Sequence, residues 1–262
     1  MLIKLMNKIK RKKIPKITII TPVLNGDKYL EKCIKSVAKQ SYPKKKIEHI
    51  VIDGGSSDNS IKIIKKYTKY IKYWHSRKDK GIYDAMNIGL KKSSGEIIGI
   101  LNSDDFYYKN TLKIVAKYFN KSKIDFLFGS VLKQKIFHNF YPEKLWYTFN
   151  IYPSHSVSFF ITKKAQKKIG FYDLNFRYSA DRDLFYRMIK KYKLFGLPTK
   201  RAEVFGKFNL YGISSNISFS TKLFEESRIR LNNKQNFFQV VLISIIYFCY
   251  FIYVKNLKIL FK

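Results

Sequence analysis

Two adjacent carboxylates, Asp104 and Asp105, follow an apolar stretch over residues 97–101 that is predicted to be a strand. At an exposed strand end such a pair suits a divalent cation, because Mg²⁺ or Mn²⁺ is held by one or two carboxylates together with the phosphates of a substrate. We therefore expect Mn²⁺ or Mg²⁺ at this loop, with Asp105 as the leading ligand and Asp104 beside it. Acidic residues in loops also make ordinary helix caps and turns, so the pair alone does not establish a metal site.

Two further polar loops have the same setting. Asp53 follows a predicted strand over residues 47–52, and the glycines after it allow close backbone approach to a ligand. Its carboxylate is placed to accept hydrogen bonds from a base or a ribose. Residues 79–87 put charges of both signs around Gly81 before another predicted helix. Each loop alone also fits a capped turn, whereas the three together suit an anionic nucleotide ligand.

Strands and helices alternate through the first half of the sequence, where short β-branched runs precede segments with apolar residues at helical spacing. We predict strands at residues 16–23, 47–52, 71–75, 97–101 and 125–128, and helices at 30–37, 59–67, 84–92 and 110–119. Such alternation predicts an α/β fold with a mainly parallel, Rossmann-like sheet flanked by helices on both faces. Ligands of these sheets bind outside the carboxyl ends of the strands, where the acidic loops would emerge.

The second half is less regular and rich in aromatic residues. We predict a helix starting near Asp181 and another over residues 219–231. We divide the chain into one domain of residues 1–232, with a half at about 16–130 that carries the acidic loops and a half at about 131–232 that completes the cleft, and an apolar tail at 233–262 with basic flanks. A length of 262 residues suits one such domain and is short for two.

The chain carries 52 lysine and arginine residues against 18 acidic ones, a formal net charge of +34 at pH 7. A field of this sign attracts phosphates, nucleic acid and anionic lipid headgroups, so we expect anionic partners. Codon use that favours lysine, isoleucine, asparagine and phenylalanine would also give part of this charge as background.

Two classes of protein would show a basic surface or metal-binding carboxylates without the ordered acidic loops described above. A non-catalytic membrane or nucleic-acid binding protein would combine the charge with base stacking on aromatic side chains. It would scatter basic and aromatic clusters without ordered acidic loops, whereas this sequence keeps its acids at strand ends, and we expect no nucleic-acid partner. A nucleotidyltransferase would place a glycine-rich basic loop directly after the first strand, where Asn25, Gly26 and Asp27 stand instead.

Residues 237–254 contain no charged side chain. As a helix rising about 1.5 Å per residue, this stretch would reach about 27 Å, close to the thickness of a bilayer core. Lys234 precedes it and Lys255 follows it, so we expect membrane contact, either as a spanning helix or as one lying at the interface. A buried helix of a soluble fold is the alternative, since Gln239 and Ser244 interrupt the apolar run.

The first 16 residues are basic but lack the apolar run and small-residue cleavage site of a signal peptide, so we expect no export. Cys33 and Cys249 lie far apart and lack the spacing of a zinc site, which also suits the cytosol. We therefore expect the cytoplasmic face of the inner membrane, with the chain peripheral or tail-anchored.

Four ordered segments resemble family 2 of the inverting nucleotide-sugar glycosyltransferases, which have the GT-A fold. They are residues 18–26 (TIITPVLNG), 51–58 (VIDGGSSD), 79–89 (DKGIYDAMNIG) and 95–105 (GEIIGILNSDD). The second half is similar to the branch that builds bacterial surface polysaccharides such as lipopolysaccharide, through residues 155–160 (HSVSFF), 170–173 (GFYD), 179–184 (SADRDL) and 212–215 (GISS). The resemblance reaches about residue 215 and leaves the tail unmatched.

The resemblance implies that Asp53 contacts the nucleotide base, that Asp104 and Asp105 form the metal and ribose-diphosphate motif, and that Asp181 is the catalytic base. It also implies substrate contacts in the matched segments, at Thr21, Pro22, Asn25, Asp79, Lys80, Gly81, Asp84, Asn87 and His155. Two positions depart from the family pattern. Ala180 replaces the usual acidic neighbour of the base, and Asn102 replaces the more common first aspartate of the metal motif, which leaves the metal preference open.

Several alternatives remain at the catalytic segment. Asp183 competes with Asp181, but on a helix the two side chains would point about 200° apart, so both cannot face one acceptor hydroxyl, and we favour Asp181. Arg182 and Arg187 suit either phosphate neutralisation or pairing with acids. His155 fits a ligand contact or a structural hydrogen bond to the backbone.

The expected reaction is a single in-line displacement in which Asp181 removes the acceptor proton and the hydroxyl attacks the anomeric carbon from the face opposite the nucleotide. A UDP-sugar is the favoured donor, with GDP- and dTDP-sugars as alternatives. The acceptor is expected to be a saccharide or a lipid-linked saccharide of surface polysaccharide assembly.

Overall fold

The computed structural model describes residues 14–210 and 217–260, with backbone alone for residues 255–260. The basic segment at residues 1–13 and the motif at residues 212–215 therefore lie outside the described residues. The strands are β1 (Ile17–Val23), β2 (Ile47–Asp53), β3 (Tyr73–Ser76), β4 (Ile97–Ile100), β5 (Phe106–Tyr107), β6 (Phe126–Phe128), β7 (Ser130–Leu132), β8 (Ile136–Phe137), β9 (Phe159–Thr162), β10 (Gly196–Pro198) and β11 (Val204–Lys207). The helices are α2 (Asp27–Ala38), α3 (Ser60–Lys66), α4 (Ile82–Lys92), α5 (Thr111–Lys121), α6 (Lys163–Ile169), α7 (Ala180–Tyr186), α8 (Phe219–Asn232) and α9 (Phe237–Leu260). Short helical turns span Lys44–Lys46, Thr68–Tyr70, Pro142–Trp146 and Arg187–Lys191.

The main sheet has seven strands in the order β10-β6-β9-β4-β1-β2-β3. β1 runs parallel to both β2 and β4, and β2 runs parallel to β3. β9 is antiparallel to both of its neighbours, β4 and β6, and is therefore the reversed strand in an otherwise parallel arrangement. The carboxyl ends of β1, β2, β3 and β4 consequently share one edge, which we call the carboxyl edge; their other ends form the amino edge.

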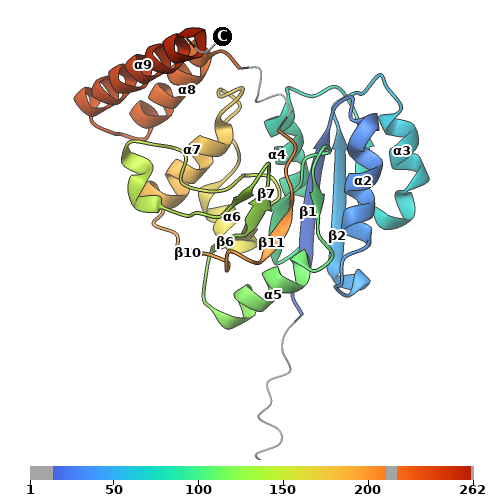
Figure 1. Cartoon of the computed structure of the whole chain (residues 1–262). Coiled ribbons are helices and arrows are strands. Elements are labelled where there is room, and N and C mark those ends of the chain that lie inside the picture. Colours follow the sequence, from blue (N-terminus) through green and yellow to red (C-terminus); the bar gives the residue numbers. More distant parts are fainter. Residues whose placement is uncertain (1–13, 211–216, 261–262) are drawn as a thin grey trace, which may run out of the picture.

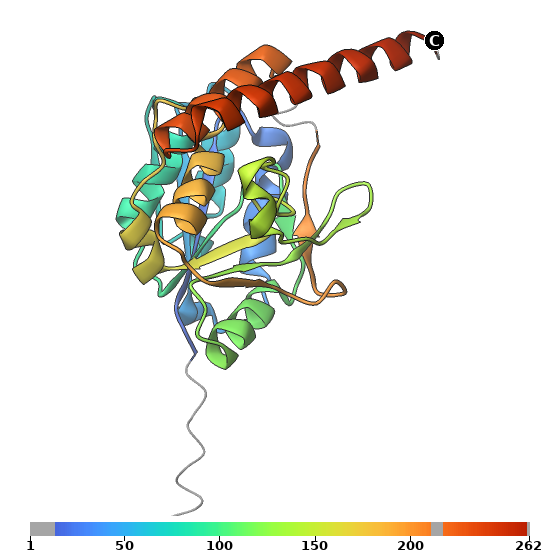
Figure 2. The same cartoon turned by 90° about the vertical axis from the view of Figure 1, so that its left-hand side faces the viewer.

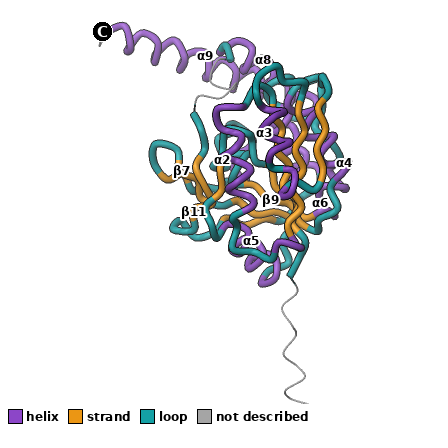
Figure 3. Tube along the Cα trace, turned by 90° about the vertical axis from the view of Figure 1, so that its right-hand side faces the viewer, coloured by secondary structure: helices purple, strands orange, loops and turns teal. Residues whose placement is uncertain are grey.

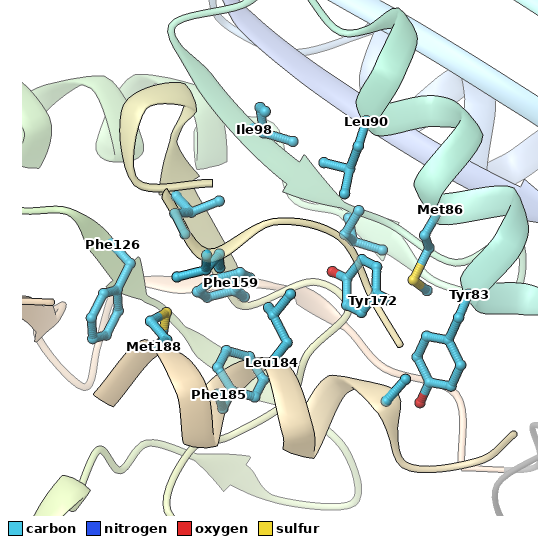
Figure 4. Close-up of a cluster of buried hydrophobic side chains, with 14 of the residues drawn as sticks. Tyr83, Met86, Leu90, Ile98, Phe126, Phe159, Tyr172, Leu184, Phe185 and Met188 are labelled. Atoms are coloured by element: carbon cyan, nitrogen blue, oxygen red, sulfur yellow. The ribbon is translucent and has the colours of Figure 1, made fainter. Parts of the chain in front are cut away.

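Helices cover both faces of this sheet (Figure 1). Alternate residues of β1 point to opposite sides, so Ile19 packs with apolar residues of α2 and α5, whereas Ile20 packs with those of α4. α3 joins α2 on the first face, which Figure 3 shows from outside. The second face holds the largest apolar cluster, to which α4, β9 and α7 contribute Met86, Phe159 and Phe185 (Figure 4).

A second, smaller sheet has the strand order β5-β11-β7-β8. β11 pairs antiparallel with β5 and parallel with β7. β5 directly follows Asp105, so this sheet continues from the carboxyl edge of the main sheet and joins it to the second half of the chain.

Buried charges on α8 fix this helix to the second half of the chain. Glu225 accepts hydrogen bonds from the backbone N–H groups of Arg177 and Tyr178, at 2.9 and 3.1 Å. Glu226 forms an ion pair with Arg182. Arg230 is 1% exposed and donates to the carbonyls of residues 145 and 146. Because unpaired buried charges are costly, these contacts make α8 an integral part of the domain.

α9 packs against α8 as far as Phe251, whose ring stacks on that of Phe219 with 4.1 Å between centroids, and its last turns project beyond the body of the molecule (Figure 2). Val240 and Ile243 are buried, and the hydroxyls of Ser244 and Ser227 lie 3.0 Å apart. Among the described residues, α9 is the one helix whose length and composition would let it cross a membrane. Its Phe237–Val254 stretch has a mean hydropathy of 2.2, and 11% of this stretch is buried within the protein.

The predicted α/β fold with a mainly parallel sheet and an apolar C-terminal helix is confirmed. Element ends differ from the prediction by a few residues. The strand expected from residue 71 begins at Tyr73, and the helix expected from Asp84 begins at Ile82. Gly81 explains the second difference. Its φ of 113° is accessible to glycine and not helical, so the loop ends at Gly81 and α4 begins at the next residue. The reversed strand β9 and the small sheet were not predicted.

Candidate active site

The loops that follow β1 and β2 are joined by hydrogen bonds at the carboxyl edge. The Asn25 side-chain oxygen accepts from the backbone N–H of Ser57 at 2.9 Å, and the Asn25 N–H donates to the Ser56 hydroxyl at 2.8 Å. Asn25 has a φ of 50°, a left-handed conformation that asparagine tolerates better than most residues. These contacts hold the first two loops as one rigid wall.

Asp53 lies at the base of this wall and is fully buried. Its Oδ2 accepts hydrogen bonds from the N–H groups of Gly55 and Ser56, at 3.1 and 3.0 Å, and from the Ser76 hydroxyl at 2.6 Å. The Ser56 hydroxyl donates to Oδ1. Since Oδ1 accepts only this one of the described hydrogen bonds, it keeps acceptor capacity for a ligand. The expected contact with a nucleotide base stays a prediction.

The third loop, between β3 and α4, brings Asp79 over the same wall. A Cβ added to Gly54 would lie 2.7 Å from Asp79 Oδ2, so glycine allows this close approach. Asp79 Oδ1 accepts from the Gly81 N–H, and Asp84 accepts from the Lys80 N–H. Burial, with smaller contributions from the neighbouring carboxylates Asp84 and Asp53, raises the pKa of Asp79. This part of the site therefore favours partners that bring hydrogen-bond donors or a cation.

Asp105 is the most deeply buried carboxylate of the loop after β4, at 2% exposed. Its Oδ1 accepts from the backbone N–H of Asn209 at 2.8 Å, while Oδ2 has no well-aligned hydrogen-bond partner among the described residues. The side-chain oxygen of Asn102, in the same loop, is also buried without such a partner. Burial, with the neighbouring charge of Asp104, raises the pKa of Asp105 to about 7.

Two buried oxygens in one loop, Asp105 Oδ2 and the Asn102 side-chain oxygen, lack a well-aligned donor among the described residues, although the Ser156 hydroxyl interacts with Asp105. Such oxygens fit a cation with oxygen ligands, because an unsatisfied buried oxygen is costly and Mg²⁺ prefers these ligands. Asp105 and Asn102 would supply these oxygens, and the half-buried Asp104 adjoins them. The described residues contain no group of three or more histidine, cysteine or acidic side chains that could hold a metal ion. A cation held by Asp105 and Asn102 would leave coordination positions for oxygens of a substrate.

Asp181 lies in the first turn of α7 and faces α4. The Tyr83 hydroxyl donates to its Oδ1 at 2.9 Å, and the Tyr152 hydroxyl donates to its Oδ2 at 3.3 Å. Each carboxylate oxygen keeps room for a further hydrogen bond. Tyr83 directly follows the loop of Asp79 and Gly81, so Asp181 is held beside the carboxyl edge.

Asp183 is not available as a competing base. Its Oδ2 forms an ion pair with Arg187 at 2.8 Å, and its Oδ1 accepts from the Asn233 amide at 3.0 Å. Arg187 also donates to the carbonyls of residues 169 and 171, and Arg182 pairs with Glu226. Both arginines thus pair with acids, which was one of the two alternatives, and of the two aspartates only Asp181 is free of an ion pair in the described structure.

Three of the expected substrate contacts lie at buried positions, and their contact with a substrate stays a prediction. Thr21 and Pro22 are buried inside β1, and the Thr21 hydroxyl bonds with His49 Nε2 at 3.0 Å, so their side chains support the sheet. Asn87 is buried on α4 and uses both ends of its amide on the backbone of Tyr172, each at 2.9 Å. The side chains of Thr21, Pro22 and Asn87 therefore support the walls of the site in this structure.

His155 is buried as well, and its Nε2 lies 2.7 Å from the Tyr172 hydroxyl. Burial lowers the pKa of His155, although the nearby Asp181 opposes the shift. The next residue, Ser156, accepts a hydrogen bond from the Asn102 N–H at 2.8 Å. This segment thus connects the Asp105 loop to the surroundings of Asp181. A direct ligand contact of His155 stays a prediction.

The tyrosines around Asp181 were missed in the sequence. Tyr83, Tyr152 and Tyr172 are all buried or half-buried, and two of them bond to the carboxylate. Tyr83 belongs to the matched segment at residues 79–89, so its place in that segment was the available signal. Nothing local distinguishes Tyr152 from the other aromatic residues of the second half.

Comparison with known proteins identifies the family of the chain. Residues 18–189 match the family described as glycosyl transferase family 2. An uncharacterized glycosyltransferase of Rickettsia typhi is 31% identical over 194 residues, which cover 67% of this chain and 59% of that protein. The chain thus spans somewhat more than half the length of this curated relative. The poly(ribitol-phosphate) β-N-acetylglucosaminyltransferase TarS of Staphylococcus aureus is 32% identical over 115 residues, or 43% of this chain and 20% of that protein.

Solved structures give the same fold. TarS residues 1–349 in complex with UDP-GlcNAc superimpose with a TM-score of 0.64 at 18% identity, covering 87% of this chain and 70% of that one. The mannosyltransferase PcManGT of Pyrobaculum calidifontis, in complex with GDP-Man and Mn²⁺, gives a TM-score of 0.62 at 15% identity, covering 84% of this chain and 63% of that one. With the family match across residues 18–189, these likenesses show that the chain has a GT-A fold and belongs to glycosyl transferase family 2.

Proposed function

We propose that the protein is a metal-dependent, inverting glycosyltransferase that moves a sugar from a nucleotide diphosphate donor to a hydroxyl of a saccharide or lipid-linked acceptor in surface polysaccharide synthesis. The observation that carries this proposal is the pairing of two carboxylates with different surroundings. Asp105 is buried with one oxygen unpartnered at the carboxyl edge, and Asp181 is held beside the same edge by two tyrosine hydroxyls.

In this reaction Asp181 accepts the proton of the acceptor hydroxyl through the free acceptor capacity of its oxygens. The acceptor oxygen forms a bond to the anomeric carbon, and the bond from that carbon to the diphosphate oxygen breaks with its electron pair leaving on the nucleoside diphosphate. Tyr83 and Tyr152 fix the carboxylate. A divalent cation at Asp105 and Asp104 would neutralise charge on the departing diphosphate. Attack from the opposite face converts an α-linked donor into a β-linked product.

A UDP-sugar is the favoured donor. Support comes from Asp53, which keeps acceptor capacity on Oδ1 for a base N–H, and from the structural likeness to TarS bound to UDP-GlcNAc. The likeness to a mannosyltransferase bound to GDP-Man keeps GDP-sugars among the donors to test, and its Mn²⁺ supports the metal assignment.

We also propose that α9 binds a membrane, with the enzyme at the cytoplasmic face of the inner membrane. Large apolar side chains lie exposed along this helix, for example Leu242, Ile246 and Tyr250 at 58%, 54% and 65% exposed. An isolated apolar patch of this extent is unusual on soluble proteins and typical of membrane or partner contacts. α9 lies at the end of the molecule opposite the start of β1, and so on the side of the carboxyl edge (Figure 1).

Turnover is the direct test of the catalytic proposal. Purified protein is incubated with UDP-, GDP- and dTDP-sugars and Mn²⁺ or Mg²⁺, and release of nucleoside diphosphate is followed. We expect release from one donor, with loss of turnover of about 1,000-fold in Asp181→Asn while donor affinity is retained. The matched control is Asp183→Asn, which should destabilise the fold through its lost ion pair but keep turnover measurable. Unchanged turnover in Asp181→Asn would overturn the assignment of the base.

Cosedimentation with vesicles tests the membrane proposal. Wild-type protein should sediment with vesicles of phosphatidylethanolamine and phosphatidylglycerol, and the double variant Leu242→Glu/Ile246→Glu should stay in the supernatant. Leu231→Glu, an exposed leucine on α8, is the matched control and should sediment like wild type. Equal sedimentation of the α9 variant, or none for the wild type, would contradict the proposal.

A further inference from the structure

We propose that Lys133 forms a binding subsite for the diphosphate of the donor. This inference rests on the proposed function and extends it to a residue in the second half of the chain, outside every motif at the carboxyl edge.

The register of the small sheet puts Lys133 and Asp105 in one row. Lys207 of β11 pairs with Leu132 of β7 on one side and with Phe106 of β5 on the other. One step further along the strands, the row therefore consists of Lys133, Phe208 and Asp105. One backbone bond continues the pairing of β11 with β7, from the Phe208 N–H to the Leu132 carbonyl at 2.9 Å. On the other side the Asn209 N–H donates to the side-chain Oδ1 of Asp105 at 2.8 Å, which keeps Asp105 beside the extension of β11.

Neighbouring strands lie about 4.8 Å apart, so the backbones of Lys133 and Asp105 are separated by about 10 Å. Residues in one row of a sheet project from the same face. The contact of the Lys133 ammonium with the Phe208 ring agrees with this, with 4.9 Å between nitrogen and ring centroid. The side chains of Lys133 and Asp105 therefore border the same space.

The ammonium of Lys133 is held in place but lacks a close anionic partner. It lies 4.9 Å from the ring centroids of both Phe137 and Phe208, which restrain it by cation–π attraction. Among the described residues it has no ion pair within 4.0 Å and no hydrogen bond to a side chain or carbonyl. Burial lowers the pKa of Lys133, and the charge of Asp105 partly opposes that shift.

A half-buried cation without a partner favours an anionic ligand, because the ligand restores the interaction that burial removes. The carboxylate in the same row as Lys133 is that of Asp105, whose backbone lies about 10 Å away, across one intervening strand. A diphosphate between them would satisfy Lys133 directly, while Asp105 and Asn102 supply oxygens for a cation. The ligand that fits this subsite is therefore a nucleoside diphosphate. The contact with Lys133 would also stabilise the negative charge of the diphosphate as it leaves.

Nucleotide titrations test this subsite without any turnover. UDP, UMP and uridine are titrated by calorimetry in Mg²⁺ against wild type, Lys133→Gln, Lys133→Arg and Lys135→Gln. Lys135 is the matched control, because it is an exposed lysine in the same β7–β8 turn. We expect Lys133→Gln to weaken UDP binding about tenfold to 100-fold, with uridine unchanged, Lys133→Arg to restore most of the affinity, and Lys135→Gln to match wild type.

Each other outcome overturns the assignment. UDP binding to Lys133→Gln at wild-type affinity removes Lys133 from the site. An equal loss for uridine and UDP shows general damage to the pocket, which melting temperatures of the variants would reveal independently. If wild type binds no nucleoside diphosphate while remaining folded, the proposed function itself fails, and this inference fails with it.

Discussion

Glu48 at the amino edge of the main sheet and Asp105 at its carboxyl edge are almost equally buried, at 4% and 2% exposed. Their surroundings differ completely. Glu48 accepts hydrogen bonds from Lys16 at 2.7 Å, from the Thr18 hydroxyl at 2.6 Å and from the Ser94 N–H at 2.7 Å. Asp105 accepts from one backbone N–H, and its second oxygen has no well-aligned partner among the described residues.

The two carboxylates therefore titrate in opposite directions. Burial alone would raise the pKa of Glu48, but hydrogen bonds from Lys16, Ser94 and Thr18 lower it to about 2. Burial and the neighbouring Asp104 raise the pKa of Asp105 to about 7. At one edge of the sheet the buried carboxylate is fully hydrogen-bonded within the protein, whereas at the other edge burial disfavours the charged form, as is common at functional sites.

The largest expected effect is that of Asp105→Asn. Donor affinity in the presence of Mn²⁺ should fall at least about 100-fold, since loss of even an indirect partner of a metal ligand costs about 10- to 100-fold. Calorimetric titration of the donor measures this. In the same variant the free energy of unfolding at pH 8 should rise, by at most about 4 kcal/mol, because the buried charge is removed. A variant that loses both stability and binding would contradict the assigned role of the edge.

Glu48→Gln should show the reverse pattern. The free energy of unfolding at pH 7 should fall by about 3 kcal/mol, because a well-bonded buried carboxylate is lost, while donor affinity stays within about twofold of wild type. Urea denaturation and the same donor titration measure the two quantities. The surface variant Glu143→Gln is the control and should change stability by less than about 0.5 kcal/mol. A large loss of donor affinity in Glu48→Gln would contradict the hypothesis that the amino edge contributes to stability and not to donor binding.

The pH dependence of stability should carry opposite signs at the two positions. Glu48 has a lowered pKa, so its contribution is complete above its ordinary pKa of 4.5 and is lost as the pH falls toward about 2. Asp105 has a raised pKa, so its penalty is complete above about pH 7 and disappears as the pH falls toward 3.8. Urea titrations from pH 3 to 8 on wild type and both variants should show these windows. Parallel curves for the three proteins would contradict the difference in pKa.

The smallest effects are expected from two buried threonines of β1. Thr18→Val should cost about 2 kcal/mol of stability, since it removes the bond donated to Glu48 and the bond accepted from the Gly95 N–H. Thr21→Val should cost about 1 kcal/mol, since it removes the bond to His49. Neither should change donor affinity. A selective loss of donor affinity in Thr21→Val would show that Thr21 contacts the substrate despite its buried position.

Much of the fold follows from the sequence, because period-two and helical apolar patterns depend on local residues alone. They predicted the strands around β1, β2 and β4 and the helices between them. The reversed strand β9 could not be predicted, since Phe159–Thr162 is a short apolar run whose direction depends on pairing with β4 and β6. The small sheet depends likewise on residues about a hundred positions apart, such as Lys207 and Phe106.

The candidate site was predicted in part. The loops of Asp53, Asp79 and Asp105 meet at one edge because the parallel strands before them share a direction. Side-chain contacts were harder to predict from the sequence. Asn87 and Thr21 lie in matched motifs, but their side chains form hydrogen bonds inside the protein, to the Tyr172 backbone and to His49. Val157 illustrates the limit, because its φ of 73° is rare for a β-branched residue and is held by tertiary contacts beside the Asn102 loop.

The most direct test of the carboxyl edge as a nucleotide and metal site is a titration of Mn²⁺ followed by electron paramagnetic resonance, which reports free Mn²⁺. In the presence of UDP, wild type and Glu48→Gln should each take up one Mn²⁺ per chain, and Asp105→Asn should take up none in the same concentration range. Without UDP the uptake by wild type should be much weaker, because the described residues offer too few ligands. Equal uptake by wild type and Asp105→Asn would contradict the account.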